Sequence, residues 1–438
     1  MNTDKKSYEN ILSPSSISPS PILIEGHDAK IFTRNIEESA LKQVKRLLDI
    51  DVFADKKIRI MPDVHAGAGC VIGFTGDLGD KVIPNIVGVD IGCGMRVLRL
   101  EGVSRIDYHA FHQHIERNVP SGMACRDERK GFRQLAGAEM ELYQQAKEEM
   151  NSLYCLRSLK DTGHIKRSIG TLGGGNHFIE LDTDPAGHIY LVLHTGSRNL
   201  GKQVADLYQR RAIGHLTEGY DEFEDDIRRL IEEYKAAGRR KEIQGEILRR
   251  RHNHEVKEPL LPAELCYLEG EAREEYLHDM RICQRWAVIN RRLIAMLLLE
   301  FFPQVSVAEE FESIHNYISD DNMIRKGAIS AAAGERCIIP LNMRDGSLIC
   351  TGKGNPDWNF SAPHGAGRVL SRSQAYRTIT MDDFKASMRG VYSESISDYT
   401  RDESPMVYKP AGEIIRGIGD TVDIDAIIRP LFNFKASK

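Results

Sequence analysis

Short runs rich in Ile, Val and Leu recur near both ends of the chain, and each run stops at a glycine-rich turn. Examples are KIRIMP, CVIGFTG, VIPNIVGVDIGCGMRVLRL and HIYLVLHTG, and similar runs return from Ile314 to Lys438. Runs of this length, with many β-branched residues and glycine at their ends, predict strands rather than helices. Both ends of the chain are therefore expected to contribute strands.

Two charged segments between these runs are predicted to be helical, over about residues 107–160 and 201–303. Within the second, residues 221–257 are charged throughout and predict a solvent-facing insertion, whereas residues 271–302 carry an apolar stripe suited to packing on a sheet. Strands from both ends must meet across this helical middle, so we expect an α+β fold. The prediction is a single intertwined domain of mixed, largely antiparallel sheets surrounded by helices, with a helical insertion over 201–303.

The N-terminal residues 1–20 are predicted to be a disordered tail, and residues 21–438 to form the domain. A segment such as SPSSISPSP buries too little apolar surface to fold, and it resembles neither a signal peptide nor an anchor. Eight scattered cysteines without a CxxC pair indicate reduced thiols, so we expect a cytoplasmic protein with no membrane partner. The net charge of -5 gives no general sign of nucleic-acid binding, so an RNA site would need a local basic groove.

A candidate metal centre is spread over four segments. In VGVDIGCGMR, Asp90 and Cys93 lie three residues apart among glycines that let the backbone turn sharply. His177, His194 and His315 each lie beside glycine or an apolar run. Each residue alone also fits a structural role, in a glycine-rich turn or as a hydrogen-bonded core histidine. Together they exceed the four ligands of a closed structural zinc site, and two ions sharing a thiolate would account for the surplus.

A candidate nucleophile lies in the segment SAPHGAGRVLSRSQA. His364 is followed by small residues that would let a phosphate approach the backbone, and a helix is predicted to start after Arg368. Neutral imidazole can attack phosphorus without first losing a proton. The alternative interpretation is a glycine-rich turn that caps a helix. The segment LGGGN, residues 172–176, is a second candidate phosphate cradle.

Six motifs occur in the order seen in RtcB RNA ligases: PDVHAGAG (62–69), VGVDIGCGM (87–95), TLGGGNHFIE (171–180), LHTGSRNLG (193–201), HN (315–316) and HGAGRVLSR (364–372). The chain resembles a divergent member of this family from about residue 25 to its C-terminus. The resemblance implies a ligase that uses GTP and two Mn²⁺ ions. Its substrates would be RNA ends with a 2',3'-cyclic phosphate or 3'-phosphate and RNA ends with a 5'-hydroxyl, in tRNA splicing or RNA repair.

The resemblance also implies roles for residues at matching positions. His364 would be the catalytic residue that accepts GMP from GTP, and Asp63 and His65 would orient metal-bound groups. One metal would be held by Asp90, Cys93 and His177, and the other by Cys93, His194 and His315. The guanylate would be bound by Asn176, His177, Phe178, Ile179, Glu180, His315, Asn316, Pro340, Leu341, Asn342, Met343, Ser347, His364, Gly365, Ala366, Gly367 and Lys435.

Basic residues outside these sets are candidates for contacts with RNA or phosphate. Arg198 and Arg368 would clamp phosphates, since a guanidinium can fork onto two oxygens, and Arg167 would contact the RNA backbone. The basic stretch 238–254 is either an extension of an RNA groove or the solvated face of a helix.

One segment departs from the family pattern. Members usually carry a PGSMG-like segment before the nucleophile, whereas this chain has PLNMRDGS from Pro340 to Ser347. Bulky Leu341, Asn342 and Arg344 could alter guanine recognition, and they motivate a rival hypothesis: a dimetal RNA-end phosphoesterase that does not join ends. A non-catalytic RNA-binding paralogue is a third hypothesis, which the full set of expected ligands disfavours. The sequence leaves open whether splicing or repair is the task, whether a protein partner activates the enzyme, and what its oligomeric state is.

Overall fold

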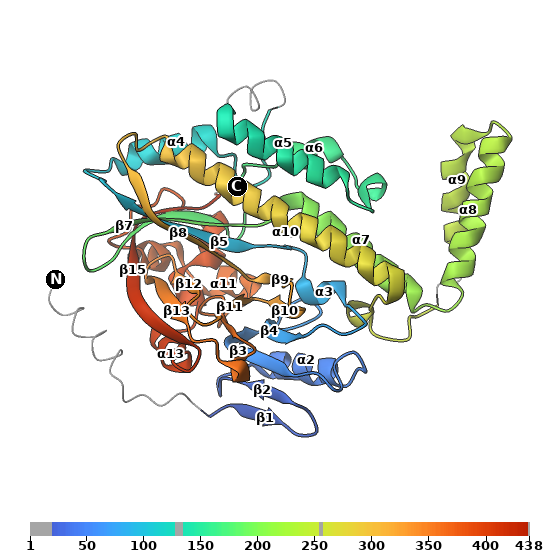
Figure 1. The fold of residues 1–438 in the computed structure, drawn as a ribbon, viewed down its shortest axis with the longest axis horizontal. Helices are drawn as coiled ribbons and strands as arrows, with labels where there is room; N and C mark the ends of the chain where they lie inside the picture. Colours follow the sequence, from blue (N-terminus) through green and yellow to red (C-terminus); the bar gives the residue numbers. More distant parts are fainter. Residues whose placement is uncertain (1–19, 128–134, 254–256, 437–438) are drawn as a thin grey trace.

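The computed structural model of the chain describes residues 20–127, 135–253 and 257–436. Curled, largely antiparallel sheets are surrounded by helices in a single mixed α+β domain (Figure 1). The fold class predicted from the sequence is therefore confirmed. The predicted disordered tail lies, apart from its last residue, outside the described residues.

The larger sheet has seven strands in the order β12-β13-β15-β6-β7-β5-β8, and neighbouring strands are antiparallel. Its strands are rich in Ile, Val and Leu, which pack well on a pleated surface. The C-terminal strand β15 lies between β13 and β6, so it joins strands from either side of the helical middle. The bounds are β5 (Gly94–Glu101), β6 (Phe178–Thr183), β7 (Ile189–Thr195), β8 (Ser306–Ile314), β12 (Arg336–Asn342), β13 (Gly346–Gly352) and β15 (Val422–Phe434).

A second sheet of six strands has the order β1-β2-β3-β4-β10-β9, and β2 and β3 are the one parallel pair among the described strands. Because β10 pairs with β4, strands from the N-terminal part meet strands that follow the helical middle. Two further short strands form a separate antiparallel pair, and the second of them ends directly before His364. The bounds are β1 (Ile22–Ile24), β2 (Ala29–Ile31), β3 (Ile58–His65), β4 (Ile72–Asp77), β9 (Asn316–Ile318), β10 (Met323–Lys326), and, in the pair, β11 (Ala328–Ser330) and β14 (Ser361–Pro363).

The longest helix, α10 (Gly270–Leu299), runs along the larger sheet beside α4, α5 and α7 (Figure 1). It packs against β5 and β7 through the apolar stripe seen in the sequence, and Trp286 and Leu293 are fully buried in the main core. The remaining helices are α2 (Glu38–Leu48), α3 (Pro84–Val87), α4 (Tyr108–Asn118), α5 (Gly137–Asn151), α6 (Thr162–Arg167), α7 (Arg198–His215), α8 (Tyr220–Ala236), α9 (Ile243–Asn253), α11 (Arg372–Thr378), α12 (Met381–Ser387) and α13 (Ala411–Gly417).

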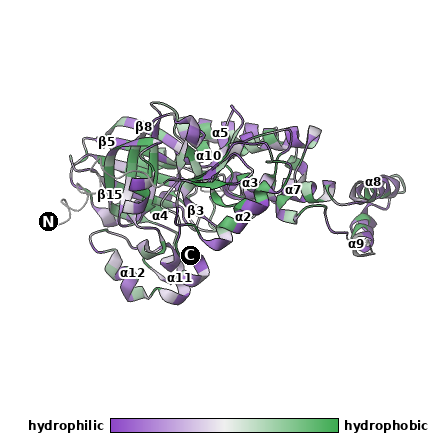
Figure 2. Cartoon of the chain, turned by 90° about the horizontal axis from the view of Figure 1, so that it is seen from below, coloured by the Kyte–Doolittle hydropathy of each residue, from purple (hydrophilic) through white to green (hydrophobic). Residues whose placement is uncertain are grey.

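Helices α8 and α9 form a hairpin that stands away from the body of the molecule (Figure 1). Figure 2 shows that this hairpin is largely hydrophilic, whereas hydrophobic residues gather on strands of the body such as β5. The chain leaves and re-enters the body at one point, where the Leu260 N–H donates to the Leu216 carbonyl oxygen at 2.9 Å. Within residues 201–303, the projecting part is thus confined to this hairpin. Among the described helices, none has the length and apolar character needed to cross a membrane.

Candidate active site

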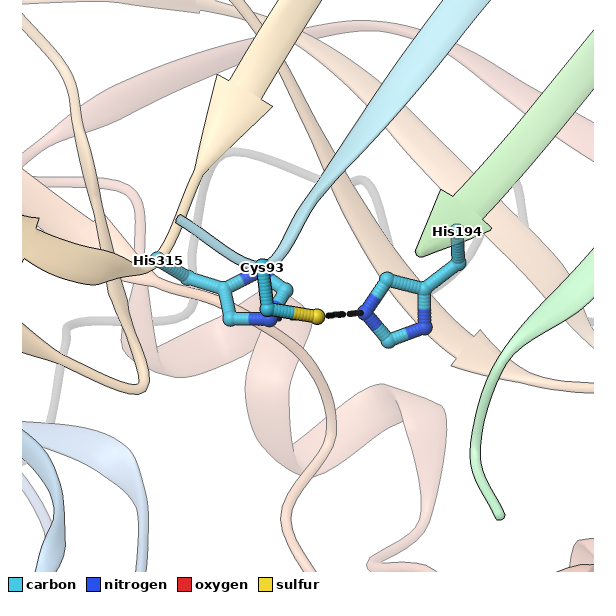
Figure 3. Close-up of side chains that lie close together, drawn as sticks. All are labelled: Cys93, His194 and His315. Carbon is cyan, nitrogen blue, oxygen red and sulfur yellow. Dashed lines mark hydrogen bonds between the residues drawn. The ribbon is translucent and has the colours of Figure 1, made fainter. Parts of the chain in front are cut away.

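Three side chains at the ends of adjacent strands converge on one point (Figure 3). Cys93 directly precedes β5, His194 lies near the end of β7, and His315 directly follows β8. Cys93 Sγ lies 3.3 Å from His194 Nε2, which lies 3.4 Å from His315 Nε2. Sheet pairing thus brings together residues that are far apart in the chain, in an arrangement able to hold one metal ion.

A second group of ligands shares the sulfur of Cys93. His177 Nε2 lies 3.0 Å from Asp90 Oδ2 and 3.6 Å from Cys93 Sγ. Burial tends to raise the pKa of Asp90, but the hydrogen bond and charge of His177 outweigh it and bring the pKa to about 2. Asp90 is therefore anionic at neutral pH, as a carboxylate ligand of a metal must be. Since a thiolate can bridge two ions, the five predicted ligands lie in an arrangement suited to two.

The protonation states of this cluster fit a metal site. Burial lowers the pKa values of His194 and His315 well below the ordinary histidine value, so both imidazoles are neutral. Nδ1 of His194 donates to the Asn176 carbonyl oxygen at 3.1 Å, which directs the lone pair of Nε2 toward Cys93. Burial raises the pKa of the Cys93 thiol. A cation beside the sulfur would reverse that shift, so this donor set matches a divalent metal ion.

Helix α10 holds the turns that carry the ligands. Arg291 is fully buried and donates to the carbonyl oxygens of Gly92 and Thr195, at 2.9 Å each, while it pairs with Glu312. Gly92 has φ +70°, and a Cβ there would lie 2.8 Å from the α10 backbone, so the turn can approach the helix only as glycine. Sequence reasoning missed Arg291, because nothing in an amphipathic pattern marks which arginine points inward.

His364 lies directly beside the ligand cluster, with its ring centroid 4.9 Å from that of His315. Its Nδ1 is 2.7 Å from Oδ2 of Asp63, which is fully buried. A carboxylate can only accept, so Nδ1 donates to Asp63 and Nε2 is the ring nitrogen left to act as a nucleophile. Asp63, expected to orient metal-bound groups, thus orients the candidate nucleophile. His65 lies in the same region and its Nδ1 donates to the Asp63 carbonyl oxygen at 2.9 Å.

A cavity of about 630 Å³ lies over His364 and several of the predicted metal ligands. Its volume is typical of small-molecule sites. Two predicted guanylate contacts do not line it: Ile179 points to the other face of β6 into the core, and His177 belongs to the ligand cluster. The predicted residues that line it are Asn176, Phe178, Glu180, His315, Asn316, Pro340, Leu341, Asn342, Met343, Ser347, His364, Gly365, Ala366, Gly367 and Lys435.

Several polar groups in the cavity wall suit a ligand with its own hydrogen-bond donors and acceptors. Ser347 Oγ is buried with no partner among the described residues. Glu180 accepts from Asn433 Nδ2 at 2.6 Å, and burial raises the pKa of Glu180 to about 7. Lys435 Nζ donates to the Asn176 carbonyl oxygen at 3.2 Å. Buried polar groups are normally satisfied, so the unpaired hydroxyl indicates a partner supplied from the cavity.

Glu403 connects several residues around this cavity, although the sequence did not draw attention to it. Its carboxylate lies 3.3 Å from Lys435 Nζ, accepts from the Tyr408 hydroxyl at 2.7 Å, and pairs with Arg368 and Arg372. Burial tends to raise the pKa of Glu403, but Lys435, Arg372 and Arg368 outweigh it and bring the pKa to about 2. Glu403 therefore fixes the cations at one side of the cavity.

The helix expected after His364 begins later than predicted. Residues 368–371 form a loop, and α11 starts at Arg372, with Ser371 as its N-cap accepting from the Gln374 N–H. The expected helix N-terminus is therefore not next to His364. Arg368 lines the cavity, but its guanidinium is engaged by the Asp402 and Leu370 carbonyl oxygens.

The other two predicted phosphate and RNA contacts lie outside the cavity lining. Arg198, at φ +60°, donates to Thr171 Oγ1 at 3.2 Å and to the Gly122 carbonyl oxygen at 3.4 Å. The Arg198 guanidinium lies directly against Gly173 of the LGGGN segment, so closely that a Cβ at Gly173 would overlap it. Arg167 ends α6.

The divergent PLNMRDGS segment forms a tight turn between β12 and β13. Asn342 Oδ1 accepts from the backbone N–H groups of Arg344 and Asp345, and Arg344 pairs with Asp345. The side chain of Leu341 is buried in a core cluster under the cavity. The bulky residues therefore stabilise the turn locally, and the cavity beside them remains open.

Comparisons with known proteins agree with this arrangement. The family model described as tRNA-splicing ligase RtcB matches residues 43–436. The chain is 28% identical to the RNA-splicing ligase RtcB of Escherichia coli (strain K12), over 92% of the chain and 96% of that relative. It is 27% identical to the tRNA-splicing ligase RtcB of Aeropyrum pernix, over 89% of the chain and 91% of that relative. Because the family model spans nearly the whole chain, from α2 to the residues after β15, this protein belongs to the RtcB family.

Proposed function

We propose that this protein is a GTP- and manganese-dependent RNA ligase. It would join RNA ends bearing a 2',3'-cyclic phosphate or 3'-phosphate to 5'-hydroxyl ends through a guanylylated His364. The main support for the proposal is the position of His364. Its imidazole is oriented by Asp63, and it lines the same cavity as the candidate metal ligands Asp90, Cys93, His194 and His315. Membership of the RtcB family supports the same activity.

Two manganese ions would occupy the two ligand groups. Asp90, Cys93 and His177 would hold one ion, and Cys93, His194 and His315 the other. Thiolate and imidazole alone favour zinc, so zinc would compete, but phosphate and water oxygens in the cavity would add ligands that suit manganese. When bound, the ions would stabilise negative charge on the phosphate oxygens.

GTP would lie with its phosphates near His364 and its base toward Glu180, Ser347 and Lys435. The unpaired Ser347 hydroxyl and the Glu180 carboxyl can bond to the polar edge of a purine, and the Lys435 ammonium can donate to its carbonyl oxygen. Glu403 would hold Lys435 in position for this contact.

The reaction would proceed through His364 in a fixed order. Nε2 of His364 attacks the α-phosphorus of GTP, and the bond to pyrophosphate breaks. The imidazolium that results keeps its Nδ1 proton, and the Asp63 carboxylate stabilises its charge. An oxygen of the RNA 3'-phosphate, formed by hydrolysis where the end is cyclic, then takes the guanylyl group from Nε2. Finally the 5'-hydroxyl attacks the activated 3'-phosphate, loses its proton to water and expels GMP.

Transfer of label from GTP to the protein tests this proposal. Incubation with α-³²P-labelled GTP and Mn²⁺ should give acid-labile label on the wild-type chain and none on His364→Ala. The same preparation should join a 2',3'-cyclic-phosphate RNA to a 5'-hydroxyl RNA. The rival phosphoesterase predicts opening of the cyclic phosphate with neither protein label nor joined product, and that result would reject the ligase. Binding of RNA without either reaction would indicate the non-catalytic alternative.

The physiological setting is part of the same proposal. The names of the two relatives refer to RNA splicing and tRNA splicing, which supports a role in tRNA processing. RNA repair is the alternative role, because it would use the same reaction on the same kinds of RNA ends. A cytoplasmic location is supported by eight cysteines that all have free thiols. Sequencing of RNA cross-linked to His364→Ala in cells would identify the substrate, since that variant should bind RNA ends without turning them over.

A further inference from the structure

An exposed apolar surface lies at the rim of the cavity. It consists of Val369, Tyr376, Tyr399 and Met406, hereafter the rim surface. Tyr399 is 69% exposed and Tyr376 is 41% exposed, which is unusual for large aromatic side chains. The Val369 N–H donates to the Val407 carbonyl oxygen at 2.8 Å, so Val369 lies beside Met406 in space. The surface is therefore assembled from two segments, 369–376 and 399–406.

The aromatic part of the rim surface is held in one geometry. The Tyr376 hydroxyl lies 3.0 Å from both the Tyr399 carbonyl oxygen and Asp402 Oδ1, and its single proton is donated to one of these two acceptors. The Arg401 guanidinium lies 5.7 Å from the centroid of the Tyr376 ring. Tyr399 has no ring contact with any residue in the described part of the chain. One tyrosine is thus fixed by polar contacts, and the other presents its ring to solvent.

The rim surface is continuous with the cavity that contains His364. Arg372 and Gln374 on α11 line the cavity, and Tyr376 lies one turn after Arg372 on the same face of that helix. A single carboxylate, Asp402, bonds to both Arg372 and Tyr376. Figure 2 shows α11 and α12 together on one side of the body. An RNA strand that leaves the cavity past Arg372 would therefore meet Tyr376 next.

We propose that the rim surface binds the single-stranded segment of RNA that adjoins the reacting end. The bases of the RNA would stack on Tyr399 and Tyr376, while Arg377 would contact the phosphates. This inference rests on the proposed function, which brings an RNA end into the cavity. Aromatic rings with neighbouring arginines are the usual platform for unpaired bases, and such stacking tolerates any sequence.

Charge and position favour RNA over a protein partner at this surface. Arg377 forms no ion pair with any described residue, so its charge is available to a phosphate. The acidic neighbours Asp402 and Glu403 are buried and already paired with arginines, and Asp398 is paired with Arg401. The other basic candidate for RNA, the hairpin of α8 and α9, stands apart from the body and contributes no residue to the cavity.

Affinity for a short RNA tests the proposal on the full-length protein. The probe is a fluorescein-labelled single-stranded oligonucleotide with a 3'-phosphate, measured by anisotropy without GTP. Tyr399→Ala and Tyr376→Ala should each weaken binding by about 5- to 150-fold, which corresponds to the loss of one stacked base. Tyr399→Phe keeps the ring and should bind like the wild type. The matched control is Tyr154→Ala, which removes a tyrosine that is 65% exposed but does not line the cavity.

The outcomes separate this proposal from the proposed function. Unchanged affinity in both alanine variants, or equal losses in Tyr399→Phe and Tyr399→Ala, would overturn the rim surface as a stacking platform. Cross-links from a 4-thiouridine probe that map to residues 220–253 rather than 369–406 would overturn it as well. Failure of the wild-type chain to take label from GTP would count against the ligase reaction alone, because the anisotropy measurement does not use GTP.

Discussion

The reactivity expected of His364 depends on one buried carboxylate. Asp63 Oδ2 lies 2.7 Å from His364 Nδ1, so replacement by Asn keeps the size of the side chain but removes the negative charge. Attack by Nε2 leaves a positive charge on the imidazole, and Asp63→Asn would no longer stabilise it. We expect the rate of label transfer from GTP to fall by about 100-fold or more, as measured by quenched time points.

Metal binding gives the control for this prediction. Asp63 is not among the metal-ligand groups, so Asp63→Asn should bind manganese with the stoichiometry of the wild type. Cys93→Ala, by contrast, removes the ligand common to both groups and should lose both metal and label transfer. An Asp63→Asn protein that transfers label at the wild-type rate would show that His364 does not need this orientation.

Glu403 provides a prediction about stability and pH. Its pKa in the folded protein is about 2, well below the ordinary value of 4.5. A lowered carboxyl pKa stabilises the fold above about pH 4.5, and this contribution is lost as the pH falls toward 2. Glu403→Gln should therefore lower the free energy of unfolding by about 3 kcal/mol at pH 7. Because Gln does not titrate, the difference from the wild type should shrink as the pH falls below 4.5.

Denaturation by urea at pH 7, pH 5 and pH 4 checks this prediction. Glu38→Gln is a suitable control, because Glu38 forms an exposed ion pair with Lys42 and its loss should cost at most about 1 kcal/mol. A Glu403→Gln difference that is small at pH 7, or that grows on acidification, would contradict the assignment of Glu403 as the counter-charge of Lys435, Arg368 and Arg372.

At the scale of elements, the loop that carries His364 is fixed by a close backbone approach. Gly367 has φ +75°, and a Cβ at this position would lie 2.3 Å from the Asp63 carbonyl oxygen. Gly367→Ala should therefore combine backbone strain with a clash, and lower the free energy of unfolding by about 2–5 kcal/mol. It should also slow label transfer, because the displaced segment contains Asp63.

Gly26 provides a matched control for Gly367. It has φ +82°, but a Cβ there would meet nothing within 4 Å, so Gly26→Ala carries the strain without the clash. Its cost should be about 1–2 kcal/mol, with no change in label transfer. Equal losses of stability in the two variants, measured by chemical denaturation, would show that the contact with Asp63 is unimportant.

The elements also show what local sequence signals can predict. The helix expected directly after Arg368 starts at Arg372, and the sequence held a better signal: Ser371 and Gln374 form a capping box. The strand-end positions of Cys93, His194 and His315 could be predicted because apolar runs and glycines mark strand ends. Arg291 and Glu403 could not, since their importance arises from burial, and burial of one charged residue depends on elements distant in the chain.

At the scale of the whole molecule, the sequence predicted that strands from both ends meet, but not which strands pair. The pairing of β10 with β4, and the position of β15 between β13 and β6, depend on packing between segments separated by hundreds of residues. No local periodicity contains that information. The candidate metal cluster depends on another long-range pairing, in which β5 lies between β7 and β8. Motif order could therefore identify its residues, whereas their distances needed the structure.

The hairpin of α8 and α9 should be dispensable for folding and for guanylylation of His364. It projects from the body, and the hydrogen bond between Leu260 and Leu216 closes its base, so a short glycine-serine linker can replace residues 218–258 without moving either end. We expect the shortened protein to keep the far-ultraviolet dichroism of its remaining elements, a melting temperature close to that of the wild type, and label transfer from GTP at the wild-type rate. A protein that aggregates or fails to take label would show instead that the hairpin stabilises α7 and α10, and with them the turns that hold the metal ligands.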